Sequence, residues 1–208
     1  MEIYGLYPES FGSNCYILIS GNEGERRQAA VIDPSVKPEK IIDLVSKNNA
    51  DIKYIILTHG HFDHVLSLDT LRDMTGAPAL IHKCDSEMLT DGDKNAHAFF
   101  FGYDKKWRPA EKLLENGDEI ALGEEVIKII STPGHSKGSI CLLSGNKLIT
   151  GDTLFEAGYG RYDLYGGDVN ALTASLSSLR ALDGQLTIYP GHGGSATLSR
   201  ALDNVLYY

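Results

Sequence analysis

The sequence predicts a layered α/β domain, because short apolar runs typical of buried strands alternate with segments whose apolar residues recur at helical spacing. The run Tyr54–Leu57 is followed by Val65, Leu68 and Leu71 at helical spacing, and then by the run Ala79–His82. A strand, a helix and a strand in this order indicate a βαβ unit with two parallel strands. A second succession of strands and helices follows without an obvious linker. We therefore expect a single domain over residues 1–208.

The predicted strands are apolar runs that end at glycine, proline, asparagine or aspartate. The turn Ser144-Gly145-Asn146 joins two of them and is typical of a hairpin. In chain order the predicted strands are Ile3–Leu6, Cys15–Ile19, Ala29–Ile32, Tyr54–Leu57, Ala79–His82, Glu119–Leu122, Val126–Ser131, Ser139–Leu143, Lys147–Thr150 and Leu186–Tyr189.

Helices are predicted where apolar residues stand three or four positions apart. Pro38 suits the first turn of the first helix, Gly76 can end the second, and Asp168 can cap the start of the third. A fourth helix closes the chain. The stretch from Asp91 to Pro109 follows no such pattern, and its run Phe99–Tyr103 is either a flap over a site or an insertion packed on the surface.

Composition and charge limit the partners of this protein. The formal net charge of -9 and the isoelectric point near 5.2 argue against nucleic acid or an anionic membrane as a partner, since both select a basic surface. The first residues lack the pattern of a secretion signal, and no apolar run is long enough to span a bilayer. Three widely separated cysteines indicate neither a disulfide framework nor a cysteine zinc site. We expect a cytoplasmic protein that acts on a small molecule, and the sequence does not predict its oligomeric state.

Metal-binding side chains are concentrated in the segment Thr58–His64, directly after the predicted strand Tyr54–Leu57. Three histidines and one aspartate occur within six positions there, and imidazole and carboxylate are ligands for zinc and related metals. If the chain stays extended, His59, His61 and Asp63 point the same way and His64 points elsewhere, which suits two adjacent ions. A polar loop that is merely rich in histidine is the alternative, and this spacing argues against it.

Three further predicted strands are each followed by a side chain that can bind metal. A histidine or an aspartate follows each of them on a turn that contains glycine, at His135, Asp152 and His192. Five of the seven histidines thus lie just after strands, which a purely structural role explains poorly. Asp33 also follows a strand and is either a partner that orients a histidine ligand or a turn residue. His82 and His97 are not assigned to metal.

The run His59-x-His61-x-Asp63-His64, with His135, Asp152 and His192 downstream, resembles the metallo-β-lactamase-fold hydrolases. The stretches Gly151–Phe155, Gly160–Asp168 and Tyr189–Gly193 are similar to those of glyoxalase II-like proteins within that superfamily. The resemblance covers essentially the whole chain. It implies the metallo-β-lactamase fold, an αβ/βα four-layer sandwich with metals at one edge between two sheets.

The resemblance also implies two divalent metal ions, with zinc expected and iron or manganese as alternatives. The first ion would take His59, His61 and His135, the second would take Asp63, His64 and His192, and Asp152 would bridge both. The best-known class of zinc β-lactamases has cysteine in place of Asp152, so antibiotic hydrolysis is not expected, and flavodiiron relatives replace His61 with an acid. Glyoxalase II has a C-terminal helical region that helps to hold glutathione, whereas this sequence ends sixteen residues after His192. The sequence therefore does not determine whether glutathione is the thiol of the substrate.

Two metal ions can hold a hydroxide and polarise a carbonyl, so the predicted reaction is metal-dependent hydrolysis. Thioesters such as hydroxyacylglutathione are the expected substrates, because a thiol of pKa about 8.5 leaves with little help from a general acid. Asp63 is the expected catalytic residue, which would orient the hydroxide by accepting its hydrogen bond. Lys137, Tyr159 and Arg161 are candidate substrate contacts, although a surface role, or an ion pair of Arg161 with Asp163, explains them equally well.

Three other functions stay open. Persulfide dioxygenases resemble the same motifs but use one iron with two histidines and one aspartate, which suits reaction with O₂. A hydrolase of lactones or other esters would need the same hydroxide. A protein that only stores metal or uses it structurally is the third, and seven donors argue against it because structural zinc sites are commonly closed by four ligands.

Overall fold

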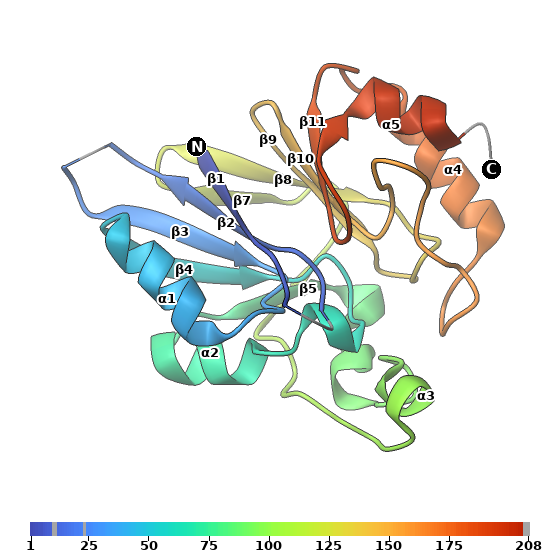
Figure 1. Ribbon diagram of the computed structural model, residues 1–208, viewed down its shortest axis with the longest axis horizontal. Coiled ribbons are helices and arrows are strands. Elements are labelled where there is room, and N and C mark those ends of the chain that lie inside the picture. The colour runs from blue at the N-terminus through green and yellow to red at the C-terminus, as the bar shows by residue number, and fades with distance from the viewer. Residues whose placement is uncertain (10–11, 23, 206–208) are drawn as a thin grey trace.

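Two β-sheets form the centre of the molecule, which is described here by a computed structural model covering residues 1–9, 12–22 and 24–205 (Figure 1). In the described residues each sheet has six strands. The first sheet runs in the order β1 (Glu2–Leu6), β2 (Cys15–Ser20), β3 (Arg27–Ile32), β4 (Ala50–Ile56), β5 (Ala79–His82) and β6 (Lys112–Leu114). The second runs in the order β12 (Ala196–Thr197), β11 (Thr187–Pro190), β10 (Lys147–Gly151), β9 (Ile140–Ser144), β8 (Glu125–Ser131) and β7 (Glu119–Leu122).

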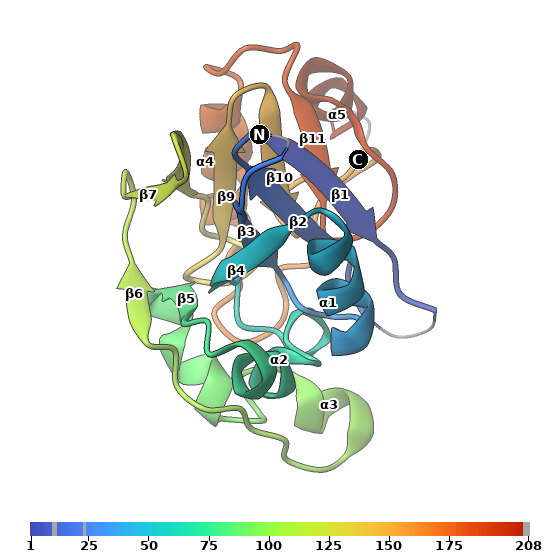
Figure 2. The same cartoon turned by 90° about the vertical axis from the view of Figure 1, so that its left-hand side faces the viewer.

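Helices cover the outer face of each sheet (Figures 1 and 2). On the first sheet these are α1 (Pro38–Lys47) and α2 (Leu68–Thr75), and on the second they are α4 (Val169–Leu179) and α5 (Leu198–Val205). A short helix, α3 (His97–Phe101), lies apart from both sheets in the two views. Two 3₁₀ segments, η1 (Phe62–His64) and η2 (Lys83–Thr90), complete the helical elements of the described chain.

Strand side chains alternate between two hydrophobic layers, and this alternation creates the sandwich. Tyr16 and Leu18 of β2 pack between the sheets, whereas Ile17 and Ile19 pack under the helices of the first sheet. Because successive side chains of a strand point to opposite faces, a strand buried on both faces is apolar at every position. All six residues of β2 are buried accordingly. The expected four-layer αβ/βα sandwich is confirmed.

The strands that precede the predicted metal ligands end at one edge of the molecule. β3 and β4 are parallel in the first sheet, and β10 and β11 are parallel in the second. β8 and β10 are both antiparallel to the intervening β9, so they also share a direction. Turns that follow these strands therefore meet where the two sheets face each other.

The predicted strands are all present, with differences at their ends. β4 begins at Ala50 rather than Tyr54, because its polar first half pairs with β3, placing Ala50 beside Arg27 and Asp51 beside Gln28. β6, β12, α3 and the 3₁₀ segments were not predicted; each is short, and propensity alone does not define such segments. In the part of the chain that the structure describes, no helix is both long enough and apolar enough to cross a bilayer.

Asp168 caps α4 as predicted: its carboxylate Oδ1 accepts hydrogen bonds from the backbone N–H groups of Asn170 at 2.7 Å and Ala171 at 3.1 Å. Replacing Asp168 with Ala leaves these donors to water and should lower the free energy of unfolding by about 1 kcal/mol. Urea denaturation of both proteins measures the difference. Asp168→Asn keeps an oxygen acceptor and should restore most of the loss; equal stabilities for the Ala and Asn variants would contradict the capping role.

Candidate metal centre

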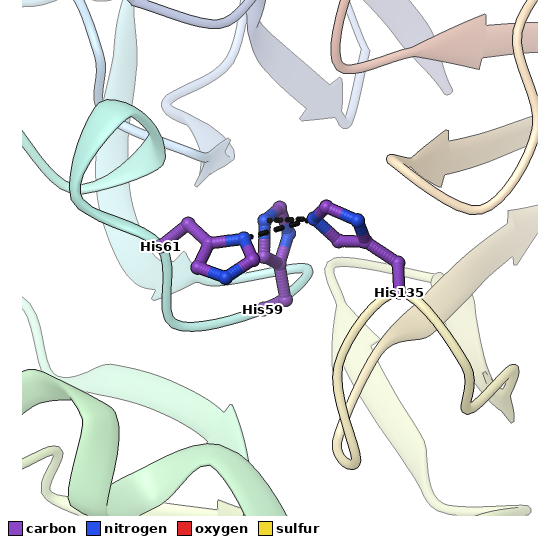
Figure 3. A group of neighbouring side chains, drawn as sticks. All are labelled: His59, His61 and His135. Atoms are coloured by element: carbon purple, nitrogen blue, oxygen red, sulfur yellow. Dashed lines mark hydrogen bonds between the residues drawn. The ribbon is translucent and has the colours of Figure 1, made fainter. Parts of the chain in front are cut away.

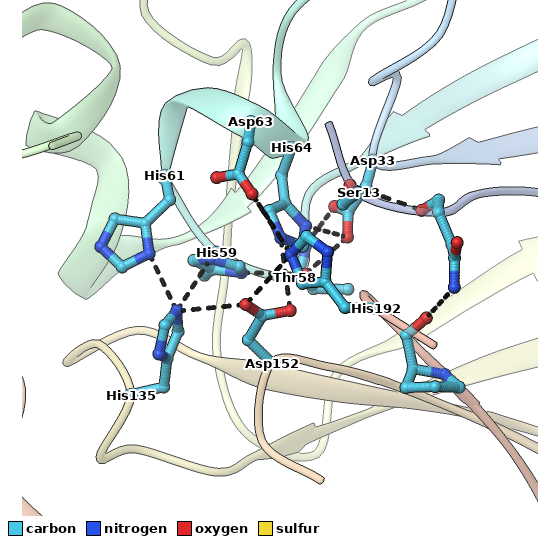
Figure 4. A network of polar contacts seen from close by, with 12 residues as sticks. Ser13, Asp33, Thr58, His59, His61, Asp63, His64, His135, Asp152 and His192 are labelled. Atoms are coloured by element: carbon cyan, nitrogen blue, oxygen red, sulfur yellow. Dashed lines mark hydrogen bonds and ion pairs between the residues drawn. The ribbon is translucent and has the colours of Figure 1, made fainter. Parts of the chain in front are cut away.

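Seven donor side chains meet at the edge where the parallel strands end (Figure 4). The segment after β4 supplies four of them, and the turns after β8, β10 and β11 supply one each, at His135, Asp152 and His192. Each of these strands is buried among apolar side chains. Burial of the strands therefore fixes the positions of their ends, and the metal-binding side chains on the following turns are held in place as a result.

The local path of the donor segment differs from the extended one that we expected. The chain is extended at His61, with φ -71° and ψ 148°, and then turns into η1. The turn carries Asp63 away from His59 and His61 and groups it with His64 and His192 instead. The prediction that His59, His61 and Asp63 point the same way is wrong. The chain forms a 3₁₀ turn after His61, where the prediction assumed an extended chain with alternating side chains.

His59, His61 and His135 form one group of facing imidazoles (Figure 3). The Nε2 atom of His135 lies 2.9 Å from Nδ1 of His61 and 3.2 Å from Nε2 of His59. All three side chains are buried. Three nitrogens thus meet at one point, and they belong to the three histidines that the resemblance assigns to the first ion.

Asp63, His64 and His192 form a second group, and Asp152 lies between the two (Figure 4). Nε2 of His192 is 3.2 Å from Oδ2 of Asp63. Asp152 directs Oδ1 to Nε2 of His64 at 3.3 Å, while its Oδ2 is 3.5 Å from Nε2 of His192 and 3.7 Å from Nε2 of His135. One carboxylate therefore faces both groups, which is the position that a bridging ligand requires.

Three acceptors outside the donor set decide which imidazole nitrogens carry protons. The carboxylate of Asp33 can only accept, so the hydroxyl of Thr58, 2.7 Å away, gives it its proton. The Thr58 oxygen must then accept from Nδ1 of His59 at 3.1 Å. Asp33 also accepts from Nδ1 of His64 at 2.8 Å, and the carbonyl of Arg161 accepts from Nδ1 of His135 at 2.6 Å. In their neutral forms all three histidines therefore present the lone pair of Nε2 to the centre.

These lone pairs fit a bound cation. The Nε2 atoms of His59 and His135 face each other at 3.2 Å, and two lone pairs cannot form a hydrogen bond. Nε2 of His64 and Oδ1 of Asp152 are buried without a hydrogen-bond partner. Buried polar atoms are normally paired, and nitrogen and oxygen donors in this number suit divalent zinc or iron. The residues present thus fit the two metal ions that the resemblance implied.

The pKa shifts of four donors, His59, His61, Asp63 and Asp152, agree with this conclusion. Burial, reinforced by the neighbouring histidines, lowers the pKa of His59 well below its ordinary value and that of His61 to about 3. Burial would raise the pKa of the Asp63 and Asp152 carboxyls, but the charge of His64 and the other histidines lowers both. His64 shows the opposite shift: burial would lower its pKa, yet Asp152, Asp33 and Asp63 raise it well above the ordinary value. The centre therefore attracts positive charge.

Two buried residues that the sequence analysis did not single out hold the donor turns. The carboxylate of Asp85 accepts from the backbone N–H of Gly60 at 3.2 Å, from that of Gly138 at 2.6 Å and from the hydroxyl of Ser136 at 2.6 Å. It thereby ties the turn of His59 and His61 to the turn of His135. Asn14 donates through Nδ2 to the carbonyls of Pro190 and Gly193, both at 3.0 Å, and so clamps the turn of His192. Neither residue belongs to a recognisable motif.

A cavity of about 510 Å³ opens beside the donors, and Asp63, His135, Asp152 and His192 line it. Of the three candidate substrate contacts, Arg161 lines the cavity and makes a bidentate ion pair with Asp163, at 2.7 and 2.8 Å. Tyr159 instead lines a separate pocket along α4 and α5, and Lys137 lies over the ring of Tyr165 in a third. The sequence could not separate these cases, because all three residues lie near the donors along the chain.

The two remaining histidines make contacts of their own. Nδ1 of His97 bonds the carbonyl of Tyr103 at 2.9 Å, and Nε2 of His82 lies 3.2 Å from the hydroxyl of Ser131. Neither belongs to a donor group in the described residues, in line with the decision to assign neither to metal.

Known proteins resemble this chain over nearly its whole length, including the metal-binding residues. The family model of the metallo-β-lactamase superfamily matches residues 9–192, which include all seven donors. The probable metallo-hydrolase YqgX of Bacillus subtilis is 32% identical over 184 residues, covering 87% of this chain and 85% of that protein. Among solved structures, BLEG-1, described as a B3 metallo-β-lactamase, has a TM-score of 0.88 and 29% identity over 97% of both chains. TTHA1623 in a di-iron-bound form has a TM-score of 0.83 and 30% identity over 99% of this chain and 100% of that one.

Asp33 contacts His64 directly and His59 through Thr58, so its carboxylate supports both donor groups. Asp33→Asn replaces one carboxylate oxygen with an amide N–H group, which cannot accept the hydrogen bond from Thr58 or His64. The substitution should weaken zinc binding by about 10- to 100-fold. Competition with a chromophoric chelator measures the affinity, and circular dichroism shows whether the variant is folded. Asp43→Asn, which removes an exposed carboxylate on α1, is the matched control. A folded Asp33→Asn protein with wild-type zinc affinity would contradict the orienting role.

Proposed function

The chain belongs to the metallo-β-lactamase superfamily, and we propose that it is a dinuclear metal-dependent hydrolase whose substrates are thioesters. The feature that supports this proposal most strongly is the convergence of seven imidazole and carboxylate donors beside the cavity, with Nε2 of His64 and Oδ1 of Asp152 buried without a hydrogen-bond partner. The relative YqgX, a probable metallo-hydrolase, supports the same class of enzyme. The similarity of Gly151–Phe155 and Tyr189–Gly193 to glyoxalase II-like proteins favours a thioester, with hydroxyacylglutathione as the reference substrate.

We assign His59, His61 and His135 to one ion, Asp63, His64 and His192 to the other, and Asp152 to both. When bound, the ions lower the pKa of water to about 7 and polarise the substrate carbonyl. The solved structure of TTHA1623 is described as a di-iron-bound form, so iron is a candidate metal beside zinc. Manganese remains a third.

We propose that Asp63 is the metal-binding residue that accepts a hydrogen bond from the attacking water. Its carboxylate lines the cavity and is partly exposed, whereas Asp152 is buried. The lowered pKa of Asp63 keeps the carboxylate able to accept the hydrogen bond that orients the water. The water oxygen forms a bond to the carbonyl carbon, the carbon–sulfur bond breaks, and the products are a carboxylic acid and a thiol.

A thioester suits the residues that surround this carbonyl. Its sulfur leaves as a thiolate, since thiols have a pKa of about 8.5, and no neutral general acid has to donate a proton. The side chains with ionisable protons that line the cavity are the metal donors and Arg161, whose pKa is raised by the hydrogen bond to Asp163. An amine or alkoxide leaving group would require a proton donor that this set does not provide.

Two other activities, β-lactam hydrolysis and persulfide oxidation, are tested with substrates of their own. BLEG-1 is described as a B3 metallo-β-lactamase, so a β-lactam tests the expectation from sequence that antibiotics are not hydrolysed. A persulfide with oxygen tests the dioxygenase alternative, for which a single iron and three ligands suffice. The second donor group of Asp63, His64 and His192 favours hydrolysis, because a mononuclear enzyme has no use for it.

Assays of the metal-loaded protein with lactoylglutathione, a simple lactone, a β-lactam and a persulfide test the proposal. We expect hydrolysis of the thioester with the highest kcat/KM, and no oxygen uptake with the persulfide. Asp63→Asn, loaded with metal to the same content, should lower kcat by about 10²- to 10⁴-fold. Oxygen uptake without hydrolysis, or a β-lactam as the best substrate, would overturn the thioesterase proposal. Full turnover by Asp63→Asn would remove Asp63 from its catalytic role.

A further inference from the structure

Apart from Arg161, the part of the cavity lining that carries no metal donor has no polar side chain. We refer to Phe62, Phe100, Phe101, Phe155 and Leu164 as the apolar wall. Phe62 stands between two donors in the sequence, His61 and Asp63, so the wall begins directly beside the centre. A cavity of about 510 Å³ lies within the range of small-molecule sites, which are mostly apolar with a few polar groups that fix orientation.

Helix α3 contributes consecutive phenylalanines that are unusually exposed. Phe99, Phe100 and Phe101 keep 68%, 50% and 42% of their surface in contact with solvent. Phe100 and Phe101 line the cavity, while Phe99 does not. Large exposed apolar groups that cluster beside a cavity commonly mark a binding site.

The segment that carries α3 is fixed in place beside the metal centre. The backbone carbonyl of the buried Asn95 accepts from the N–H of Phe62 at 3.0 Å, and its side chain donates to the carbonyl of Lys105 at 2.9 Å. The ring of Phe62 contacts those of Phe100 and Phe101, with centroids 5.5 and 5.4 Å apart. The part of the apolar wall formed by Phe62, Phe100 and Phe101 is therefore in place before any substrate binds.

Arg161 does not make this cavity a site for an anionic acyl group. Its Nε and Nη2 atoms are both used by the carboxylate of Asp163. Its guanidinium also lies over the rings of Phe99 and Phe100, 5.9 and 5.8 Å from their centroids. The only Lys or Arg of the described cavity lining thus has its charge compensated, and a substrate carboxylate would compete with Asp163 for it.

We propose that the acyl group of the substrate is an apolar chain or ring that binds against the apolar wall, rather than a short hydroxyacyl group. This inference rests on the proposed thioester hydrolysis, in which the wall would hold the carbon chain while the carbonyl faces the donors. It makes Phe100 a residue that determines specificity.

A series of N-acetylcysteamine thioesters tests the inference, because the thiol stays constant while the acyl group changes from lactoyl and acetyl to butanoyl and hexanoyl. For the metal-loaded wild type we expect kcat/KM to increase by up to about fourfold for each added methylene, and to be lowest for acetyl and lactoyl. Phe100→Ala should reduce the ratio of hexanoyl to acetyl kcat/KM by about fivefold or more. Phe99→Ala, on the same helix but outside the cavity lining, is the matched control and should keep the wild-type ratio.

The outcomes separate this inference from the proposed function. Turnover with no dependence on chain length, a preference for lactoyl, or equal effects of the two Phe variants would overturn the apolar acyl site and leave thioester hydrolysis in place. If no thioester is hydrolysed, the proposed function fails. The apolar acyl site is then tested separately, by measuring the binding of substrate analogues. Calorimetric titration with ketone analogues, in which a methylene replaces the sulfur, then supports the site if the hexanoyl analogue binds more tightly and Phe100→Ala removes the difference. Equal affinities for the acetyl and hexanoyl analogues overturn it.

Discussion

The positions of three protons control the chemistry of this centre. Asp33, Thr58 and the carbonyl of Arg161 accept hydrogen bonds from the Nδ1 atoms of His64, His59 and His135. Each of these histidines therefore directs the lone pair of Nε2 toward the other metal-binding side chains. Asp33 adopts a left-handed backbone conformation with φ 51°, which is uncommon for a residue other than glycine. Such conformations persist where the surrounding structure enforces them. Here the hydrogen bonds of Asp33 to Thr58 and His64 do so.

The sandwich provides the rigidity that these hydrogen bonds need. Donors from the first sheet meet donors from the second, so any shift between the sheets would separate them. Backbone contacts cross the junction at the centre: the N–H of Ile140 bonds the carbonyl of Thr58 at 2.9 Å, and that of Asn14 bonds the carbonyl of Gly191 at 2.6 Å. Gly191 has no room for a side chain, since a Cβ atom would lie 2.1 Å from Oδ1 of Asp152. Beyond the donors, the fixed aromatic segment of α3 gives the site its apolar side.

Sequence patterns captured the parts of the molecule that depend on periodicity and spacing. Strands buried on both faces, such as β2, are continuous apolar runs, and the donors follow such strands on short turns. The path after His61 was not predictable, because a 3₁₀ turn of three residues has no periodicity of its own. The role of Asp85 was also hidden, since nothing near it in sequence marks a buried carboxylate. Likewise, Lys137 and Tyr159 lie near donors in sequence but line other pockets, which only the tertiary structure reveals.

The central claim is that two cations replace the missing hydrogen-bond partners of this centre, with Asp152 shared between them. The most direct measurement is the molar ratio of metal to protein, determined by elemental analysis of protein purified without chelator and again after reconstitution with excess zinc and removal of the unbound metal. The account predicts a ratio near two for the wild type and a lower ratio for Asp152→Ala, because both ions lose a ligand in that variant. A reconstituted wild-type ratio of one or less would contradict it.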